Sequence, residues 1–345
     1  MAHQSSQSPP RFYFVINGGS GRDDLDSTLG SIETAMGQAG RKYELFILDN
    51  TLGIDLTIQA AVNAAQADNG VVVAVGGDGT INAVASAAMA ARCLFGAIPR
   101  GTFNYFGRTH HIPEDIDAAL DDLLLGTPVP VQVGWVNDRI FLVNASVGLY
   151  PELLEDREQF KKRYGRSRLV ALWSAIVTAL GEHRQLDMLL EEGGKEQRLR
   201  AATLFVGNNR LQLEQVGMPQ AELVTRGELA AIAVNPVSTL ALFGLAARGA
   251  VGRLADADNV TGFSFRHLTV TPLGLWRGMR SAWRPSLARA AARKRRVKVA
   301  VDGEIIWLQA PLTFRVGNDP LMLIKPARDA AEQAVDVGVI HADAS

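Results

Sequence analysis

The segment Val71–Val84, which reads VVVAVGGDGTINAV, constrains the fold more than any other part of the sequence. Five apolar residues typical of a buried strand run directly into three glycines, one aspartate and one threonine, and a helix-compatible run follows at once. A fully apolar strand that turns straight into a helix is typical of parallel α/β sheets. Glycine allows a tight turn and a close approach to a ligand, because it has no Cβ. The segment therefore predicts an α/β unit with a phosphate-binding turn.

The first third of the sequence repeats this alternation of strand and helix. The expected strands are Arg11–Ile16, Tyr43–Leu48, Val71–Val75 and Leu94–Ile98. The expected helices are one that contains Leu25, Leu29, Ile32 and Met36, followed by Thr57–Ala67, Thr80–Ala91 and Ile116–Leu125. Ligands in such sheets bind at the carboxyl ends of the strands, where the loops 17–21, 49–51, 76–80 and 99–104 fall. We therefore expect these four loops to form a single site in a Rossmann-like parallel sheet.

After residue 128 the pattern changes to short β-type runs separated by turns. The expected strands are Val131–Val136, Arg139–Ser146, Leu186–Glu191, Arg198–Gly207, Leu229–Asn235, Gly262–Thr271 and Arg296–Val301. Helical stretches at 166–181 and 238–253 interrupt them. This pattern predicts a β-rich, mainly antiparallel C-terminal domain, folded as a sandwich or a barrel.

The expected domain limits follow from this change of pattern. Residues 1–10 read as a disordered lead and 11–128 as the α/β domain. Residues 129–325 form the β-rich domain, and 326–345 return to the first domain, with a helix expected at 327–334.

Charge and cysteine content exclude several classes of protein. The formal net charge of −1 argues against whole-molecule binding to nucleic acid. The single cysteine, Cys93, permits neither an intrachain disulfide nor a thiolate metal cluster, and it reads as a core residue. The start of the sequence lacks the apolar run of a signal peptide, and no apolar stretch is both long and uninterrupted enough for a transmembrane helix. We expect a cytoplasmic protein.

Asp78, which lies inside the glycine turn, has two readings. It could cap the following helix in a purely structural turn, or it could hold a magnesium ion, a water or a substrate proton beside a bound phosphate. The turn is neither a Walker A loop, since no Gly-Lys-Ser/Thr follows, nor a dinucleotide G-x-G-x-x-G.

Four motifs in order resemble the diacylglycerol kinase catalytic family, which includes sphingosine and ceramide kinases and bacterial lipid kinases. Gly76-Gly77-Asp78-Gly79-Thr80-Ile81-Asn82 resembles the signature of that family. Asn17-Gly18-Gly19-Ser20-Gly21 resembles N-P-x-S-G, and Pro99-Arg100-Gly101-Thr102-Phe103-Asn104 resembles P-x-G-T-x-N. Asp302-Gly303-Glu304 resembles a late D-G-E, and weaker similarities occur at 144–148 and 206–208.

The resemblance implies an α/β nucleotide-binding domain of the phosphofructokinase and NAD-kinase type, joined to a β-sandwich lipid domain. It implies an ATP-dependent kinase that transfers the γ-phosphoryl group to the hydroxyl of a membrane lipid, diacylglycerol or a similar one, with Mg²⁺. Glu304 would act as the general base, with Asp78 close to it. The implied nucleotide-binding residues are Asn17, Gly19, Ser20, Gly21, Thr51, Gly76, Gly77, Asp78, Gly79, Thr80, Ile81, Asn82, Gly101, Thr102 and Asn104.

Two departures from the family pattern concern metal binding. Tyr105 stands where the family commonly has an aspartate after P-x-G-T-x-N, and Arg226 stands in place of the acid of a later Asp-Gly-x-Leu element. These acids are associated with a structural cation in some bacterial members, so the resemblance does not carry that cation over to this chain. Magnesium bound to the nucleotide near Asp78 is a separate expectation.

A basic segment, Arg277–Lys298, contains nine basic residues and no acid, with Trp276 and Trp283 beside them. Its two readings are a solvated face and a peripheral contact with an anionic membrane surface at the inner face of the membrane. The sequence specifies neither the lipid acceptor nor the oligomeric state, and a homodimer stays open. Two other functions stay open as well: a soluble NAD-kinase-like phosphotransferase, and a non-catalytic regulator that binds nucleotide or lipid.

Overall fold

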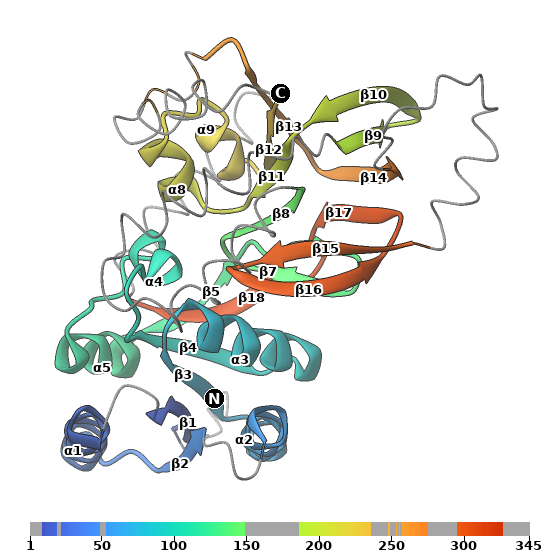
Figure 1. Ribbon diagram of the computed structural model, residues 1–345. Coiled ribbons are helices and arrows are strands. Elements are labelled where there is room, and N and C mark those ends of the chain that lie inside the picture. The colour runs from blue at the N-terminus through green and yellow to red at the C-terminus, as the bar shows by residue number, and fades with distance from the viewer. Residues whose placement is uncertain are drawn as a thin grey trace, which may run out of the picture. The chain divides into compact units, whose positions relative to one another are not determined.

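The computed structural model describes residues 9–18, 22–48, 53–148, 186–235, 248, 253, 255, 257–274 and 295–326 (Figure 1). The chain divides into two compact units, residues 1–131 with 319–345, and residues 132–318.

The first unit is built on one six-stranded sheet with the strand order β2-β1-β3-β4-β18-β5. Its strands are β1 (Phe12–Asn17), β2 (Tyr43–Leu48), β3 (Val71–Gly76), β4 (Leu94–Pro99), β5 (Thr127–Val131) and β18 (Leu321–Lys325). The first five strands in that order are parallel, and β5 pairs with β18 in the antiparallel sense. The parallel α/β sheet expected from the alternating pattern is therefore present.

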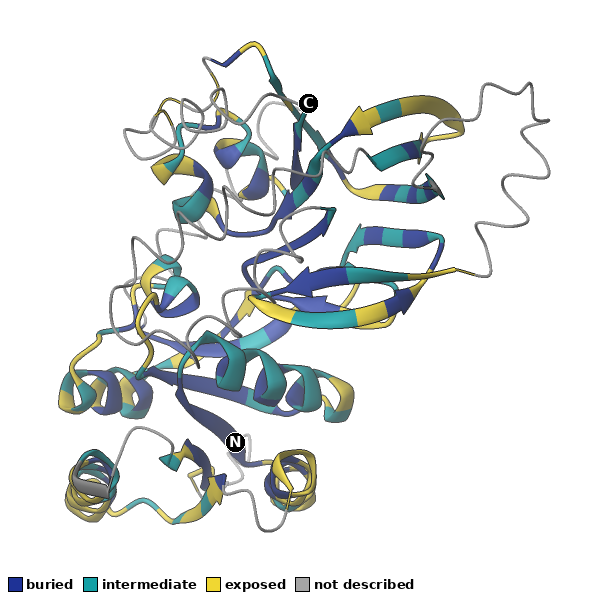
Figure 2. Cartoon of the chain, viewed as in Figure 1, coloured by how far each residue is buried: buried dark blue, intermediate teal, exposed yellow. Residues whose placement is uncertain are grey.

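Helices cover both faces of this sheet. They are α1 (Arg22–Gln38), α2 (Ile54–Asp68), α3 (Asp78–Ala91), α4 (Tyr105–Thr109) and α5 (Ile116–Leu125). α2 packs against α3, and α1 packs against α5, and Figure 1 shows the two pairs on either side of the sheet. Every residue of β3 is buried (Figure 2), as expected for a central parallel strand that is covered on both faces.

The second unit contains two six-stranded antiparallel sheets. One has the order β10-β9-β14-β17-β6-β7 and the other the order β13-β12-β11-β8-β15-β16. The strands are β6 (Gly134–Val136), β7 (Arg139–Phe141), β8 (Asn144–Gly148), β9 (Leu186–Glu192), β10 (Lys195–Ala201), β11 (Thr203–Gly207), β12 (Leu229–Val234), β13 (Val260–Phe265), β14 (His267–Gly274), β15 (Arg296–Val301), β16 (Glu304–Gln309) and β17 (Leu312–Val316).

The two sheets of the second unit share one hydrophobic core. Phe141 and Phe314 of the first sheet pack in the same buried cluster as Val206 and Ala231 of the second. Two short helices, α8 (Arg210–Gln215) and α9 (Ala221–Val224), form a smaller cluster with β12.

Three runs expected as single strands are each two strands in the structure. Arg139–Ser146 divides into β7 and β8, Arg198–Gly207 into β10 and β11, and Gly262–Thr271 into β13 and β14. In each case the two strands belong to different sheets. Because both sheets face the same core, the apolar pattern continues across the break and hides it. The run Val131–Val136, also expected as one strand, contains the end of β5 and the whole of β6. The short elements α4, α8, α9, β16, β17 and β18 were not expected from the sequence.

The boundaries of the units also differ from the expected residues 128 and 326. β5 and β18 pair with each other at the edge of the first sheet, so the units meet at residues 131–132 and 318–319. The helices expected at 166–181, 238–253 and 327–334 lie almost wholly outside the described residues. No helix within the described ranges is long and apolar enough to cross a membrane.

Candidate functional site

The described parts of three of the four expected loops lie at one edge of the parallel sheet. Ile16 of β1 is in register with Val75 of β3, and Gly76 is in register with Pro99 of β4. The loops that follow β1, β3 and β4 therefore leave the sheet side by side. The loop at 49–51 lies outside the described residues.

The first contact joins the β1 loop to the glycine turn. The Asn17 side-chain amide donates a hydrogen bond of 3.1 Å to the hydroxyl of Thr80, in the first turn of α3. Gly76 lies close to that threonine: a Cβ added to Gly76 would lie 2.9 Å from the Thr80 side chain. Glycine at position 76 therefore lets α3 begin immediately after the strand.

The second contact joins the glycine turn to the β4 loop. A Cβ on Gly101 would lie 2.7 Å from the Cα of Gly77, so the two backbones approach as closely as glycine permits. The Arg100 amide donates a hydrogen bond of 2.8 Å to the Gly76 carbonyl. The guanidinium of Arg100 also pairs with Asp24 of α1. These contacts hold the glycine turn and the β4 loop as one surface.

Asn104 closes the β4 loop on itself. Its backbone is left-handed, with φ of 50°, and its side-chain oxygen accepts a hydrogen bond of 2.8 Å from the Gly101 amide. Its side-chain NH₂ donates to the Gly101 carbonyl at 3.1 Å and to Glu114 at 3.4 Å. The residue is 4% exposed. These bonds give Asn104 the geometry of a loop anchor.

Asp78 is the first residue of α3, which begins two residues before the start expected from the sequence. Its side chain also contacts the start of α4. Its two carboxylate oxygens accept hydrogen bonds from the backbone amides of Phe106 (3.2 Å) and Tyr105 (3.4 Å). These amides open α4, whose N-cap residue Asn104 makes no side-chain capping bond. Burial raises the pKa of the Asp78 carboxyl, and these backbone bonds oppose the shift.

Phe103 and Tyr105 form an aromatic pair on the same loop. Their rings stack with centroids 5.9 Å apart and planes 7° from parallel, and Phe103 is 54% exposed. The position at which the family commonly has an aspartate is thus part of an aromatic stack in this chain.

His110 packs its side chain against α4 and is partly buried. It follows α4, its ring packs edge-on against Phe106 at 4.6 Å, and its Nδ1 is buried without a hydrogen-bond partner. Burial, with the nearby charge of Lys325, lowers the pKa of His110 to about 3. A neutral imidazole therefore packs beside α4.

In the second unit, Asp302-Gly303 form the two-residue turn between β15 and β16. Both have positive φ, 46° and 89°, as a type I′ hairpin turn requires. The Asp302 carboxylate accepts three backbone hydrogen bonds, from Leu142 (2.7 Å), Val143 (2.9 Å) and Asn144 (2.8 Å). Asp302 therefore fixes its hairpin to the turn before β8, a role that the sequence reasoning missed.

Glu304 is the first residue of β16, in register with Val301 and exposed to solvent. It directly follows the turn that Asp302 anchors. The backbone that carries Glu304 is therefore fixed from two sides, by the β15 ladder and by the β7–β8 turn.

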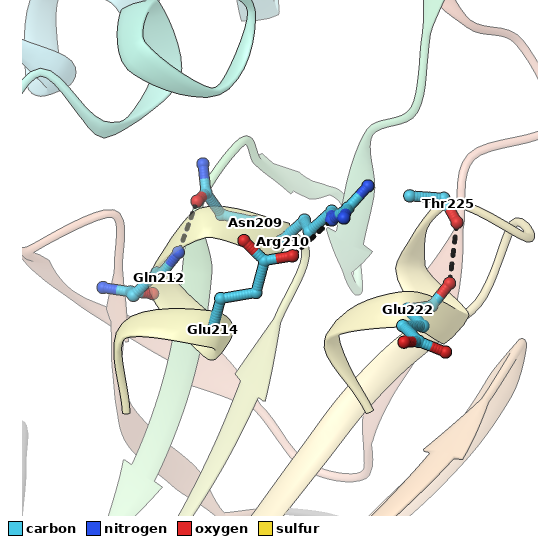
Figure 3. Close-up of polar contacts among 6 residues, drawn as sticks. All are labelled: Asn209, Arg210, Gln212, Glu214, Glu222 and Thr225. Carbon is cyan, nitrogen blue, oxygen red and sulfur yellow. Dashed lines mark hydrogen bonds and ion pairs between the residues drawn. The ribbon is translucent and has the colours of Figure 1, made fainter. Parts of the chain in front are cut away.

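A group of amide side chains lies next to this turn. The Asn144 side-chain NH₂ donates a hydrogen bond of 3.0 Å to the side-chain oxygen of Gln212. The Asn208 side-chain NH₂ donates to the backbone carbonyls of Gln132 and Leu142. Asn209 caps α8 by accepting a hydrogen bond of 2.9 Å from the Gln212 amide (Figure 3). The stretch after Asn208 is thus a capped helix in this chain.

Arg226 lies on an exposed turn, with its carbonyl accepting a hydrogen bond from Arg266 at 3.1 Å. Within the part of the chain that the structure describes, no group of three or more His, Cys, Asp or Glu side chains could hold a metal ion. With Tyr105 in an aromatic stack and Arg226 in a turn, these two positions do not fit a protein-bound cation.

Some of the predicted site residues cannot be placed. Gly19, Ser20, Gly21 and Thr51, together with most of the basic segment 277–298, lie outside the described residues. The remaining predicted residues of the first unit lie on the three loops or in the first turns of α3: Asn17, Gly76, Gly77, Asp78, Gly79, Thr80, Ile81, Asn82, Gly101, Thr102 and Asn104.

A glycine turn at the carboxyl edge of a parallel sheet, at the start of a helix, is typical of α/β proteins that bind phosphate groups. Comparison with known proteins narrows this class. The diacylglycerol kinase catalytic domain matches residues 11–136. A diacylglycerol kinase of Staphylococcus aureus (strain bovine RF122 / ET3-1) is 30% identical over 218 residues, which cover 62% of this chain and 67% of that protein. The chain therefore belongs to the diacylglycerol kinase family and is a phosphotransferase with an alcohol group as acceptor.

Solved structures show a similar fold over most of the chain. A crystal structure of a diacylglycerol kinase from Bacillus anthracis str. Sterne covers 92% of this chain and 97% of its own, with a TM-score of 0.60 and 17% sequence identity. A second structure from the same strain covers 92% and 98%, with a TM-score of 0.66 and 16% identity.

Proposed function

We propose that this protein is an ATP-dependent lipid kinase that transfers the γ-phosphoryl group of ATP to a hydroxyl of a membrane lipid, diacylglycerol or a similar one. Its relatives in Staphylococcus aureus bear the name diacylglycerol kinase. The first unit would bind the nucleotide, and the second would bind the lipid and activate its hydroxyl.

One observation carries the proposal: the glycine turn Gly76–Thr80 is joined to both neighbouring loops. Asn17 bonds to Thr80 from one side, and Gly101 meets Gly77 from the other. Phosphoryl transfer needs positioning and charge stabilisation more than covalent chemistry. A preformed surface of backbone amides, free of Cβ atoms at Gly77 and Gly101, supports binding of a triphosphate at this edge.

Glu304 is proposed as the general base that accepts the proton of the lipid hydroxyl. A carboxylate needs only hydrogen-bond reach of that hydroxyl to do so. The exposure of Glu304 and the three hydrogen bonds that fix Asp302 support this role, since the base would be both accessible and held in place.

Asp78 is proposed to position α4 and to face the nucleotide. Its oxygens accept backbone amides from the start of α4, and a carboxylate has about four acceptor sites in all. Mg²⁺ that enters with ATP typically takes one or two carboxylates besides the phosphates, so Asp78 fits a nucleotide-borne ion. Such an ion would neutralise phosphate charge.

The test is phosphoryl transfer from γ-labelled ATP with magnesium, in mixed micelles. The acceptors are diacylglycerol, a sphingoid base, ceramide and phosphatidylglycerol, with NAD as a control. We expect label in a lipid. Label in NAD would establish the soluble NAD-kinase-like alternative instead, and ATP binding without label in any acceptor would establish the regulator.

Matched variants connect the result to the site. Glu304→Gln removes the base, and Glu192→Gln alters an exposed glutamate at the end of β9 in the same unit. We expect only the first variant to lose transfer. Equal rates for both would remove Glu304 from the reaction.

A further inference from the structure

The hairpin of β15 and β16 presents one face away from the core of the second unit. Side chains alternate along a strand, and Val297, Val299 and Leu308 of this hairpin belong to the core or pack against it. Arg296 and Lys298 have the opposite orientation, and their cross-strand partners are Gln309 and Trp307. We call these four residues the hairpin face.

The hairpin face combines an exposed indole with positive charge. Trp307 is 51% exposed, although tryptophan is among the most apolar side chains. The Lys298 ammonium lies 5.4 Å from the centroid of its ring, and Arg296 is exposed one cross-strand pair further along. None of the four residues is acidic.

A second cation–Trp pair in the same unit provides a comparison. Arg315 of β17 lies 4.8 Å from the ring of Trp135 on β6, its cross-strand partner. Trp135 is less exposed than Trp307, and its indole nitrogen lies close to Gly317. The exposure of Trp307 is therefore not a general property of such pairs in this unit.

We propose that the hairpin face binds the surface of an anionic phospholipid bilayer. Tryptophan partitions to the boundary between headgroups and acyl chains, where its apolar ring and its N–H are both accommodated. Lys298 and Arg296 then meet anionic headgroups with complementary charge. The inference rests on the proposed function, because a kinase of membrane lipids must reach its acceptor at such a surface.

A second copy of the chain fits the face less well. In a two-fold interface the same patch lies on both subunits, so the basic side chains of both copies would share one interface that holds no acid from the patch. Like charges opposed in this way are unfavourable. An anionic surface removes this repulsion.

The experiment is co-sedimentation of the full-length chain with two kinds of vesicle, pure phosphatidylcholine and phosphatidylcholine with phosphatidylglycerol. We expect binding to the anionic vesicles, released by high salt. Arg296→Gln with Lys298→Gln should lower the partition coefficient about 25-fold, since one basic residue at the surface is worth about 1 kcal/mol, or about fivefold. Trp307→Ala should weaken binding to both kinds of vesicle.

Controls separate this surface from the rest of the molecule. Arg315→Gln removes a cation that also lies over a tryptophan, and it should change binding by less than twofold. If Trp307→Ala reduces folding, Trp307→Phe is the second variant, and tryptophan fluorescence is the readout. With anionic vesicles the wild type should show a blue shift, because the Trp307 indole enters lipid, and Trp307→Phe should not.

Two results would overturn the proposal. One is binding of the Arg296/Lys298 double variant at the wild-type level. The other is a dimer, detected by light scattering, that Trp307→Ala dissociates while vesicle binding persists. Vesicle binding is measured without ATP or acceptor, so a chain that transfers no phosphate can still bear out or refute this surface.

Discussion

An aspartate organises each of the two motif regions, but the two aspartates do so differently. Asp78 accepts two backbone amides at 3.2 and 3.4 Å, and burial raises the pKa of its carboxyl. Asp302 accepts three amides at 2.7 to 2.9 Å. The first aspartate is held by longer bonds and costs free energy when ionised, whereas the second is held by three shorter bonds. We infer that Asp78 responds to a ligand or to pH more readily than Asp302, which anchors the residue that follows it.

The largest effect is expected from the base. Glu304→Gln should lower kcat about 10²- to 10⁴-fold, the usual contribution of general-base catalysis, with little change in stability because the side chain is exposed. Steady-state kinetics with the preferred lipid measures this loss. A variant within threefold of wild type would leave the second unit without a catalytic role.

Asp78→Asn comes next. Asparagine can accept one of the two amides but turns its own NH₂ toward the other, so α4 should shift and turnover should fall at least 100-fold. The pH dependence provides a second readout. A carboxyl whose folded pKa is raised favours folding in its protonated form, so its stabilisation is lost as pH rises through that pKa. In denaturation measured from pH 4 to 8, the variant should not show this loss of stability with rising pH. A variant that keeps its activity would show that Asp78 has no part in the mechanism.

Gly101→Ala tests the contact between the first-unit loops. Its Cβ would lie 2.7 Å from the Cα of Gly77, a backbone atom, and 2.8 Å from the side-chain oxygen of Asn104, so the loops must separate. Overpacking of this kind costs about 1–3 kcal/mol, which we expect as a 5- to 150-fold loss of nucleotide affinity. Gly37→Ala, where a Cβ meets nothing within 4 Å, is the matched control.

Asp302→Asn tests the anchor. It removes the charge from three hydrogen bonds, and we expect a loss of about 1.5–3 kcal/mol in the free energy of unfolding. Because Asp302 acts through Glu304, kcat should fall while KM for ATP stays constant. The expected loss of stability with an unchanged kcat would show that Asp302 has a purely structural role.

The smallest effect at neutral pH is expected from His110. Its folded pKa of about 3 lies below the ordinary value of 6.5, so the unfolded state binds the proton first as pH falls. Stability is therefore complete above pH 6.5 and should decline by up to about 1.4 kcal/mol per pH unit below it. His110→Gln should flatten this part of the stability profile in urea denaturation. An unchanged slope would mean that other groups dominate acid unfolding.

Local patterns made the parallel sheet and the glycine turn predictable. β2 and α5 begin and end at the predicted residues, because apolar runs and glycine breaks mark them. Three features depend on tertiary contacts and were missed. α4 is too short to show a period, the strands that change sheets keep one apolar pattern, and the partners of Asp302 lie about 160 residues away in the sequence.

The most direct test of the division between the two units is equilibrium binding of a non-hydrolysable ATP analogue, with magnesium, to the wild type, Gly101→Ala and Glu304→Gln. We predict that Glu304→Gln binds the analogue as the wild type does and that Gly101→Ala binds it at least fivefold more weakly. Wild-type binding by Gly101→Ala, together with loss of binding by Glu304→Gln, would contradict the assignment of the nucleotide to the first unit.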